Sequence, residues 1–285
     1  MINFAIRNIK VYFRDKTSVF FSLLSVFIII GLYALFLGKV WTNSLEGLVP
    51  NPEQLMDSWL MAGILSVISF TTTMGAFGTM VDDKVKKIFK DFSASPLKRT
   101  SLVGGYIIAS YIIGILMSLV AFVLLDAYLF IADGYIIGFV ATLEVLGLIC
   151  LSTLANTSIV FFITSLFKTQ TAFGTASTVV GTIIGFIAGI YMPIGNFPPA
   201  VQLIVKLFPV SHSAALFRRI IMAEPLASAF NGVVGDYRNT FELEMGVVFK
   251  LGDFVFAPWI EIVILLATAA IFYGLSLLML SRKAK

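Results

Sequence analysis

The sequence predicts an all-α membrane protein with six transmembrane helices, an N-terminal amphipathic interfacial helix, and a re-entrant helical hairpin between spans five and six. Of the 285 residues, 59% are hydrophobic, whereas soluble domains are about 45–50% apolar. The mean hydropathy is +0.97. The apolar residues gather in runs of about 20 or more, the length that a helix needs to cross a hydrocarbon core of about 30 Å. These observations place residues 1–285 in a single transmembrane domain.

The first element, residues 1–16, is expected to be an amphipathic helix that lies along the cytoplasmic membrane surface. Its apolar and basic residues each recur at spacings of three and four, which places them on separate helix faces: Ile2, Ile6, Ile9 and Phe13 on one, and Arg7, Lys10 and Arg14 on another. Such a helix buries its apolar face and directs its cations toward lipid phosphates. An ordinary basic flank of the first span is the alternative.

Six apolar runs follow, and each is long enough to form a membrane span. The predicted spans are residues 17–38, 59–80, 101–130, 136–167, 171–192 and 259–281. Fourteen of the 20 Lys and Arg residues lie on the same side of these spans as the N terminus, and six lie on the other side. Because cytoplasmic loops are rich in Lys and Arg, both termini are expected in the cytoplasm. We expect a multi-pass protein of a bacterial plasma membrane.

Residues 193–258 are expected to form the extracellular and re-entrant segment between spans five and six. Its two apolar pieces, AVQLIVKLFP and SHSAALFRRIIM, are too short to span a membrane, and Pro209 separates them. Ser211 occupies a favourable position for a helix N-cap. Residues 231–257 are expected to be a loop or a small hairpin, because glycines mark several turns: Gly232, Gly235, Gly246 and Gly252.

The motifs of common enzyme classes are missing from the sequence. It contains no GxxxxGK[ST], no GxSxG and no HExxH, so neither a phosphate loop nor these catalytic sites are present. A single cysteine and a single histidine argue against a metal site built from these side chains. The sequence therefore predicts no catalytic residue, no metal and no cofactor held by this chain. The net charge of +4 is explained by cytoplasmic loops beside lipid and not by a nucleic-acid partner.

The densest cluster of charge is DDKVKKIFKDFSASPLKR, residues 82–99, between spans two and three. Its apolar residues share one face of a helix: Val85, Ile88, Phe89 and Phe92. Two aspartates precede the lysines, which matches the helix dipole, and Pro96 ends the helix because it lacks a backbone donor. A solvated basic loop would explain the cations but not the apolar stripe or the proline. We therefore expect a short amphipathic helix on the cytoplasmic side.

This pattern resembles the coupling helix in the permease subunits of type-two (ABC-2) ABC transporters. That family has an acidic start, an aromatic or Leu stripe, and Ser/Thr-Pro-x-Lys/Arg before the next span, here Ser95-Pro96-Leu97-Lys98. The N-terminal helix resembles the family's connecting helix. Pro198-Pro199 followed by FPVSHSAALFRRIIM resembles its re-entrant pair. The resemblance implies a subunit of an ATP-driven exporter, such as a multidrug efflux pump, which moves an amphipathic drug, lipid or peptide outward by alternating access.

The resemblance also implies partners and sites. Two copies of a separate cytoplasmic ATPase would bind ATP and Mg, and a second permease copy or a related permease would complete the pore. The ATPase-coupling residues are then Asp82, Asp83, Lys86, Lys87, Phe89, Lys90, Phe92, Pro96, Lys98 and Arg99. Spans two and five would face the substrate path, which assigns Phe70, Thr72, Thr73, Thr178, Thr182 and Phe186 to it.

Glu144, inside span four, supports an alternative function. A carboxylate within a membrane span is costly and indicates a functional role by default. We therefore include Glu144 in the candidate substrate path. It could also be the coupling group of a secondary transporter driven by an ion gradient, although a position near the outer interface would leave it without either role. A membrane scaffold without transport is a third possibility.

Overall fold

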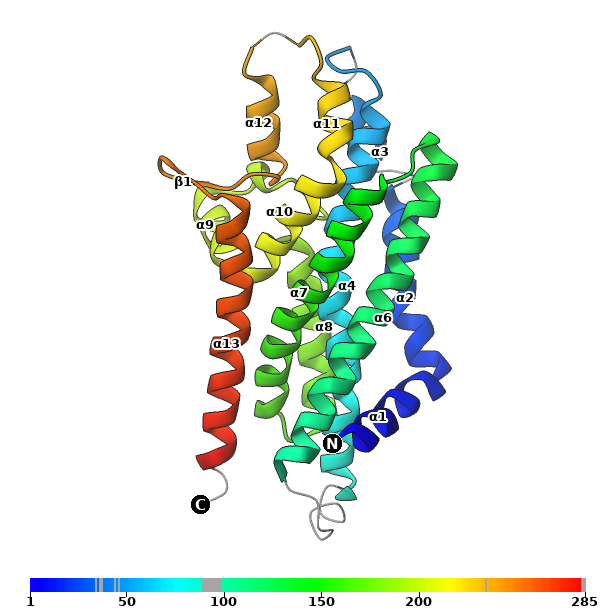
Figure 1. Cartoon of the computed structure of the whole chain (residues 1–285), viewed down its shortest axis with the longest axis vertical. Helices are drawn as coiled ribbons and strands as arrows, with labels where there is room; N and C mark the ends of the chain where they lie inside the picture. The colour runs from blue at the N-terminus through cyan, green and yellow to red at the C-terminus, as the bar shows by residue number, and fades with distance from the viewer. Residues whose placement is uncertain are drawn as a thin grey trace.

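Long helices run side by side along the longest axis of the molecule (Figure 1). The computed structural model describes residues 1–33, 35, 38–43, 45, 47–88, 99–233 and 235–282. Within them, five helices are long and apolar enough to cross a membrane: α4 (Pro52–Val85), α6 (Arg99–Asp133), α7 (Phe139–Leu166), α8 (Gln170–Ile187) and α13 (Pro258–Arg282). The number rises to seven if each of two bent helix pairs forms one span. This confirms an all-α membrane protein, while the count of six remains a prediction.

The first bent pair consists of α1 (Ile2–Arg14) and α2 (Lys16–Leu32), with 73° between α1 and the Val19–Leu32 part of α2. A short helix α3 (Gly38–Asn43) follows α2, and residues 34, 36 and 37 of the predicted first span lie outside the described residues. Figure 1 shows α1 at the same end of the bundle as the last turn of α13. We call this the α1 end, and the opposite end, which holds α12 (Tyr237–Glu244), the α12 end.

Helix α4 forms the centre of the bundle. It packs against α6, α7, α8 and α10 (Pro209–Ile221), and 89% of its most apolar stretch is buried, against 17% for α8. Polar contacts tie it to its neighbours, since the Asn156 amide of α7 donates to Ser69 Oγ at 2.7 Å. Gly114 of α6 permits a close approach, because a Cβ there would lie 2.7 Å from methyl groups of Thr73 and Thr153.

Helix α4 is longer than the predicted second span at both ends. Pro52 lies in its first turn, where proline's fixed φ favours helix initiation. At the α1 end the helix continues through Val85, so Asp82 and Asp83 belong to α4 and do not begin a separate helix. Lys87 then has a φ of +60°, and such a left-handed residue ends a helix. Residues 89–98, which include Phe89, Lys90, Phe92, Pro96 and Lys98, lie outside the described residues.

Helix α8 ends at Ile187, before residue 192, the predicted end of span five. Gly189 has a φ of +70°, and the Ile190 amide donates to the Gly185 carbonyl at 3.1 Å. This is the hydrogen bond of a glycine-terminated helix. The 3₁₀ turn η2 (Ile194–Asn196) and helix α9 (Pro199–Leu207) follow.

The second bent pair, α9 and α10, meets at 85°. The prediction that Ser211 caps α10 is wrong, because Phe208 occupies the N-cap position and Pro209 starts the helix. The Ser211 hydroxyl instead donates to the carbonyls of Val205 at 2.5 Å and Phe208 at 2.6 Å. It therefore satisfies acceptors at the end of α9 and helps to fix the bend.

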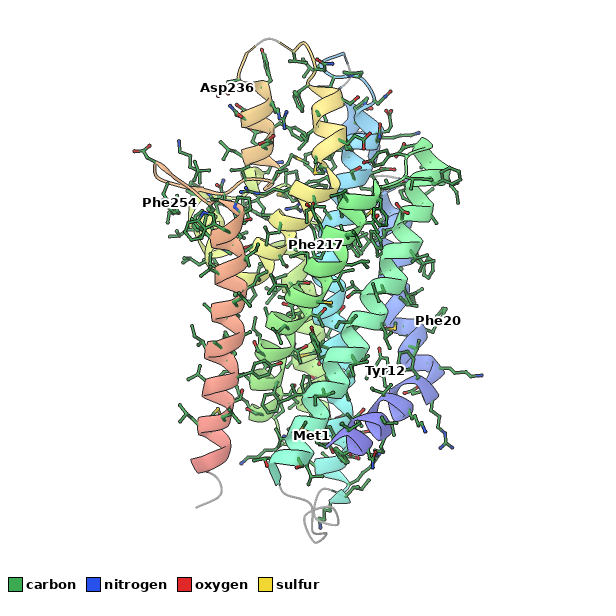
Figure 2. All side chains as sticks on the ribbon, in the orientation of Figure 1. Met1, Tyr12, Phe20, Phe217, Asp236 and Phe254 are labelled. Carbon is green, nitrogen blue, oxygen red and sulfur yellow. The ribbon has the colours of Figure 1, made fainter. Side chains whose placement is uncertain are left out.

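The α12 end is covered by short elements: α11 (Ala223–Ala229), α12, and a hairpin of β1 (Lys250–Leu251) and β2 (Phe254–Val255). The hairpin pairs Lys250 with Val255 and Leu251 with Phe254. All four glycines expected to mark turns have positive φ: Gly232, Gly235, Gly246 and Gly252. The small hairpin was thus one of the two forms predicted for this segment, and Figure 2 shows Phe254 on it, projecting away from the bundle.

Candidate functional site

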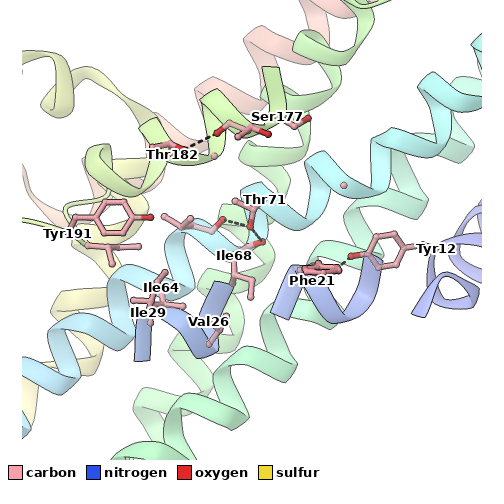
Figure 3. Close-up of a pocket in the computed structure, with 16 residues that line it drawn as sticks. Tyr12, Phe21, Val26, Ile29, Ile64, Ile68, Thr71, Ser177, Thr182 and Tyr191 are labelled. Atoms are coloured by element: carbon pink, nitrogen blue, oxygen red, sulfur yellow. Dashed lines mark hydrogen bonds between the residues drawn. The ribbon is translucent and has the colours of Figure 1, made fainter. Parts of the chain in front are cut away.

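A groove with a volume of about 680 Å³ lies between α2, α4 and α8. Figure 3 shows its two unlike walls. Helices α2 and α4 contribute mainly aliphatic side chains, among them Val26, Ile29, Ile64 and Ile68, and α8 contributes hydroxyls. Tyr12 of α1 and Tyr191 lie at opposite ends of the groove.

Some of the predicted path residues lie in this region. Thr178 and Thr182 line the groove. Phe70 lines a smaller neighbouring cavity of about 160 Å³ that shares Thr71, Gly75, Ser177 and Gly181 with the groove. Phe186 is exposed on α8, and its ring centroid lies 5.0 Å from that of Tyr191.

Thr72 and Thr73 do not line either cavity. Both are fully buried, and their hydroxyls donate to carbonyls of their own helix, Ile68 at 2.5 Å and Ser69 at 2.8 Å. The neighbouring Thr71 lines both cavities. Sequence alone could not select Thr71 from the run of three threonines, because α4 is buried nearly all around and has no single apolar face.

Glu144 lies in the second turn of α7 and is exposed. It does not line the groove, whose described residues come mainly from α2, α4 and α8 and not from α7. Two buried carboxylates lie near the α12 end, Asp57 in α4 and Glu261 in the first turn of α13. Glu261 pairs with Arg219 of α10 at 3.4 Å. The residues are separated by 42 positions, and neither was selected from the sequence as part of an ion pair.

Asp83 is the buried member of the four predicted coupling residues whose side chains are described, which are Asp82, Asp83, Lys86 and Lys87. Its carboxylate accepts hydrogen bonds from Arg7 Nη1 at 2.5 Å and Arg7 Nη2 at 3.2 Å, and from the Tyr106 hydroxyl at 2.6 Å. Its side chain is 5% exposed and that of Arg7 is 33% exposed. The hydrogen bonds to Asp83 raise the pKa of Arg7 above its ordinary value, although partial burial acts in the opposite direction. This arrangement ties α1, α4 and α6 together at the α1 end.

The remaining described coupling residues are more accessible. Lys86 pairs with Asp82 at 3.4 Å across one helical turn, with 63% and 41% of the two side chains exposed. Lys87 is exposed directly after α4. The backbone of Arg99 begins α6. The structure therefore brings Asp82, Lys86 and Lys87 to the surface at the α1 end, next to the segment that lies outside the described residues.

Helix α1 packs closely against α6 at two consecutive glycines, Gly104 and Gly105. A Cβ at Gly104 would lie 2.8 Å from the Met1 sulfur, and one at Gly105 would lie 2.6 Å from Phe4 Cδ1. The Phe4 ring meets the Tyr106 ring edge to face, with centroids 5.0 Å apart. Figure 2 shows Met1 and Tyr12 on α1 beside the lower part of α6. The sequence showed this glycine pair but not its role.

Two consecutive arginines of α10 hold the α12 end together. Arg218 is fully buried; it donates to the carbonyls of Ala188 at 2.7 Å and Gly189 at 3.2 Å, and lies 4.8 Å from the Trp59 ring centroid. These carbonyls end α8, where the helix dipole favours a cation. Arg219 donates to the Val247 and Phe256 carbonyls. Helix α10 thus joins α4, α8 and α13 at the α12 end.

The comparison with known families agrees with these features. A family described as "ABC-2 family transporter protein" matches residues 39–278, which is most of the chain and includes both the α4 and α8 walls of the groove. No curated protein matched the chain. The match confirms the resemblance inferred from residues 82–99 and the order of the spans. The chain therefore belongs to the ABC-2 family, as a multi-pass transmembrane subunit of an ABC transporter that works with an ABC ATPase.

Proposed function

We propose that this chain is one of two membrane subunits in an exporter that moves an amphipathic drug, lipid or peptide out of a bacterial cell by alternating access. The second subunit is another copy or a related permease, and two copies of a separate ATPase hold the ATP and Mg. In this proposal both termini are cytoplasmic. The α1 end then faces the ATPase, and the α12 end, with the re-entrant α9–α10 pair, faces outward.

The groove between α2, α4 and α8 is the observation that supports an amphipathic substrate. Among the residues that the structure describes, its lining contains no Asp, Glu, Lys, Arg or His side chain. A polymer that carries many charges would lose its hydration there without an ion-pair partner for each charge, which is costly in an apolar environment. The volume of about 680 Å³ falls within the range of about 300–1,000 Å³ that is common for sites of drug-sized ligands.

The segment 82–99 is the proposed docking site for the ATPase, and α4 connects it to the groove. The groove wall on α4 extends from Ile64 to Gly75, and the same helix continues without a break to Val85. Gly75 and Lys86 are separated by about 16 Å at a rise of about 1.5 Å per residue. A displacement of Lys86 and Lys87 by the ATPase would therefore reach the groove through one rigid element.

The proposal is tested by co-expressing the chain with its candidate ATPase and purifying the complex through a tag on this chain. We expect the ATPase to co-purify with the wild type. Phe89→Ala and the double change Lys86→Glu with Lys87→Glu should each remove the ATPase or abolish the stimulation of ATP hydrolysis by substrate. Reversing the two lysine charges should weaken ATPase binding, because docking surfaces of two partners carry complementary electrostatic potentials.

Lys168→Glu is the matched control, because Lys168 is exposed in the turn before α8, outside segment 82–99. It should leave ATPase binding unchanged. If this control and the double lysine variant behave alike, segment 82–99 is not the docking site. If no ATPase co-purifies with the wild type, the choice of ATPase or the exporter assignment is wrong.

An ion-gradient transporter that uses Glu144 receives no support from the described residues. Glu144 is exposed on α7 and does not line the groove. The family match also favours a subunit driven by a separate ATPase. Transport is measured as uptake of a labelled amphiphile into inside-out vesicles. Glu144→Gln should keep this uptake within about twofold of wild type, because substitutions of exposed side chains away from a site usually have small effects.

A further inference from the structure

The Ser and Thr hydroxyls that line the groove on α8 already donate their hydrogens to backbone carbonyls of the same helix. Ser177 donates to the Phe173 carbonyl at 2.8 Å, Thr178 to the Gly174 carbonyl at 3.2 Å, and Thr182 to the Thr178 carbonyl at 3.0 Å. A carbonyl oxygen only accepts, so in each pair the hydroxyl is the donor. The α8 wall therefore turns hydroxyl lone pairs, and not hydroxyl hydrogens, toward a ligand.

The same pattern holds on the other side of the groove. The Thr71 hydroxyl donates to the Ile68 carbonyl at 3.2 Å. Tyr12 donates to Ser22 at 3.3 Å, and Ser22 in turn donates to the Val19 carbonyl at 2.7 Å. The described part of the lining contains no Lys, Arg, His, Asn, Gln or Trp. Among the described side chains of the lining, Tyr191 is therefore the hydroxyl left to donate, and acceptors outnumber donors.

Two further features define what such a site can hold. The wall opposite α8 is aliphatic, with Val26, Ile29 and Ile64 in the lining, and it accommodates an apolar body. The rings of Tyr12, Phe21 and Tyr191 lie toward the ends of the groove, and the faces of aromatic rings attract cations. An anionic head would find few donors and would be left unsatisfied.

We propose that this groove binds amphiphiles whose polar head donates hydrogen bonds, with primary or secondary ammonium compounds as the preferred class. The ammonium hydrogens meet the lone pairs of Thr178 and Thr182, while the apolar body contacts α2 and α4. This inference rests on the proposed function, in which the groove is the substrate path. It narrows that function by excluding carboxylate and phosphate heads.

Binding of three fluorescent single-chain amphiphiles tests the proposal. They share one chain and one fluorophore and differ only in the head: primary ammonium, trimethylammonium and carboxylate. The full chain is reconstituted without ATPase in nanodiscs of zwitterionic lipid, and empty nanodiscs correct for partitioning. We expect the primary ammonium to bind about tenfold more tightly than trimethylammonium, because only the primary ammonium can donate charge-assisted hydrogen bonds to the threonine oxygens. The carboxylate should bind most weakly.

Two valine variants localise the effect. Thr178→Val together with Thr182→Val keeps the side-chain shape, removes both acceptors, and should weaken ammonium binding about tenfold while changing trimethylammonium binding less than twofold. Thr175→Val is the matched control, because Thr175 is exposed on the same helix and donates to the Thr171 carbonyl at 3.1 Å, but does not line the groove. It should bind all three probes like wild type.

Equal affinity of the wild type for all three heads would overturn the proposal, and this comparison needs no variant. Equal affinity for the two cations would overturn the role of donor hydrogens. Equal effects of Thr175→Val and the double variant would show that the probes bind elsewhere. Because no ATPase is present, the expected selectivity would stand even if residues 82–99 proved not to bind an ATPase, so the two proposals fail separately.

Discussion

Asp83 illustrates how a single buried side chain can connect three helices. Its carboxylate accepts from Arg7 of α1 and Tyr106 of α6 while it is itself part of α4. Among the described residues, Asp82, one position earlier, makes a surface pair with Lys86. Buried charge pairs are expensive to break, because the remaining partner stays buried without compensation, whereas surface pairs contribute little. Adjacent aspartates should therefore differ strongly in their effect on stability.

Asp83→Ala should lower the free energy of unfolding by about 2–3 kcal/mol, because Arg7 and Tyr106 lose their shared acceptor. Asp82→Ala should cost less than about 1 kcal/mol, since its pair with Lys86 is exposed. Thermal unfolding of both purified variants in the same detergent measures the difference. Equal midpoints would mean that the Asp83 contacts do not stabilise the bundle.

Sequence could identify residue types at this scale but not their partners. The aspartates before the lysines were expected to face an ATPase, yet which of them is buried depends on α1, a helix about 76 positions away in the chain. The Arg219–Glu261 pair crosses 42 positions in the same way. Thr71, Thr72 and Thr73 could not be separated, because a helix enclosed on all sides has no polar face to identify.

Helix α1 is positioned by the absence of side chains on α6. Gly104 and Gly105 leave space for Met1 and Phe4, and a Cβ at either position would overlap them. Small residues allow membrane-associated helices to approach closely. Gly147 of α7 is a useful contrast, because nothing lies within 4 Å of a Cβ built there.

Gly105→Ala should loosen α1, because the new methyl group displaces Phe4 from its contact with Tyr106. Hydrogen exchange of the α1 backbone amides, followed by mass spectrometry, should become at least about tenfold faster, which corresponds to about 1.4 kcal/mol of lost protection. Gly147→Ala should leave α1 exchange unchanged and raise stability by up to about 1 kcal/mol through helix propensity. If exchange of the α1 amides is unchanged in Gly105→Ala, close packing at Gly105 does not hold α1 in place.

Apolar runs located the long helices, but local backbone features determined where they end. Helix α4 starts earlier than predicted because Pro52 initiates it, and α8 stops sooner because Gly189 adopts a left-handed conformation. Pro209 separates the two short helices as expected, and it does so as the first residue of α10. Such residues act within one or two turns, so hydropathy averaged over a whole span cannot resolve them.

At the scale of the whole molecule, the two ends differ in chemistry. The α1 end has exposed cations on α1 and in the turns after α4 and α7, including Lys10, Arg14, Lys86 and Lys168. The α12 end has the folded cap of α11, α12 and the hairpin. Lys and Arg accumulate on the cytoplasmic side of membrane proteins, which supports the orientation we propose.

Cysteine labelling tests this orientation, because Cys150 is the one cysteine in the sequence. In a Cys150→Ser background, Asp253→Cys at the α12 end should react with a membrane-impermeant maleimide on intact cells. Lys168→Cys at the α1 end should react only after permeabilisation. Both positions are exposed, so accessibility in the folded chain does not separate them. The opposite pattern would reverse the proposed topology.

Helix α4 is surrounded by other helices, and this has a consequence for how the chain enters the membrane during synthesis. It is less apolar than α6, α7 and α13, and it buries the side-chain hydroxyls of Ser58, Ser66 and Thr72. The Ser66 and Thr72 hydroxyls donate to carbonyls of α4 itself. Ser69 of α4, however, accepts from the Asn156 amide of α7, and lipid cannot supply such a partner. Since α6 and α7 follow α4 in the chain, we expect a nascent α4 to remain beside the insertion machinery until these two helices emerge. We therefore expect the topology of the N-terminal half to be fixed only when α4, α6 and α7 enter the membrane together.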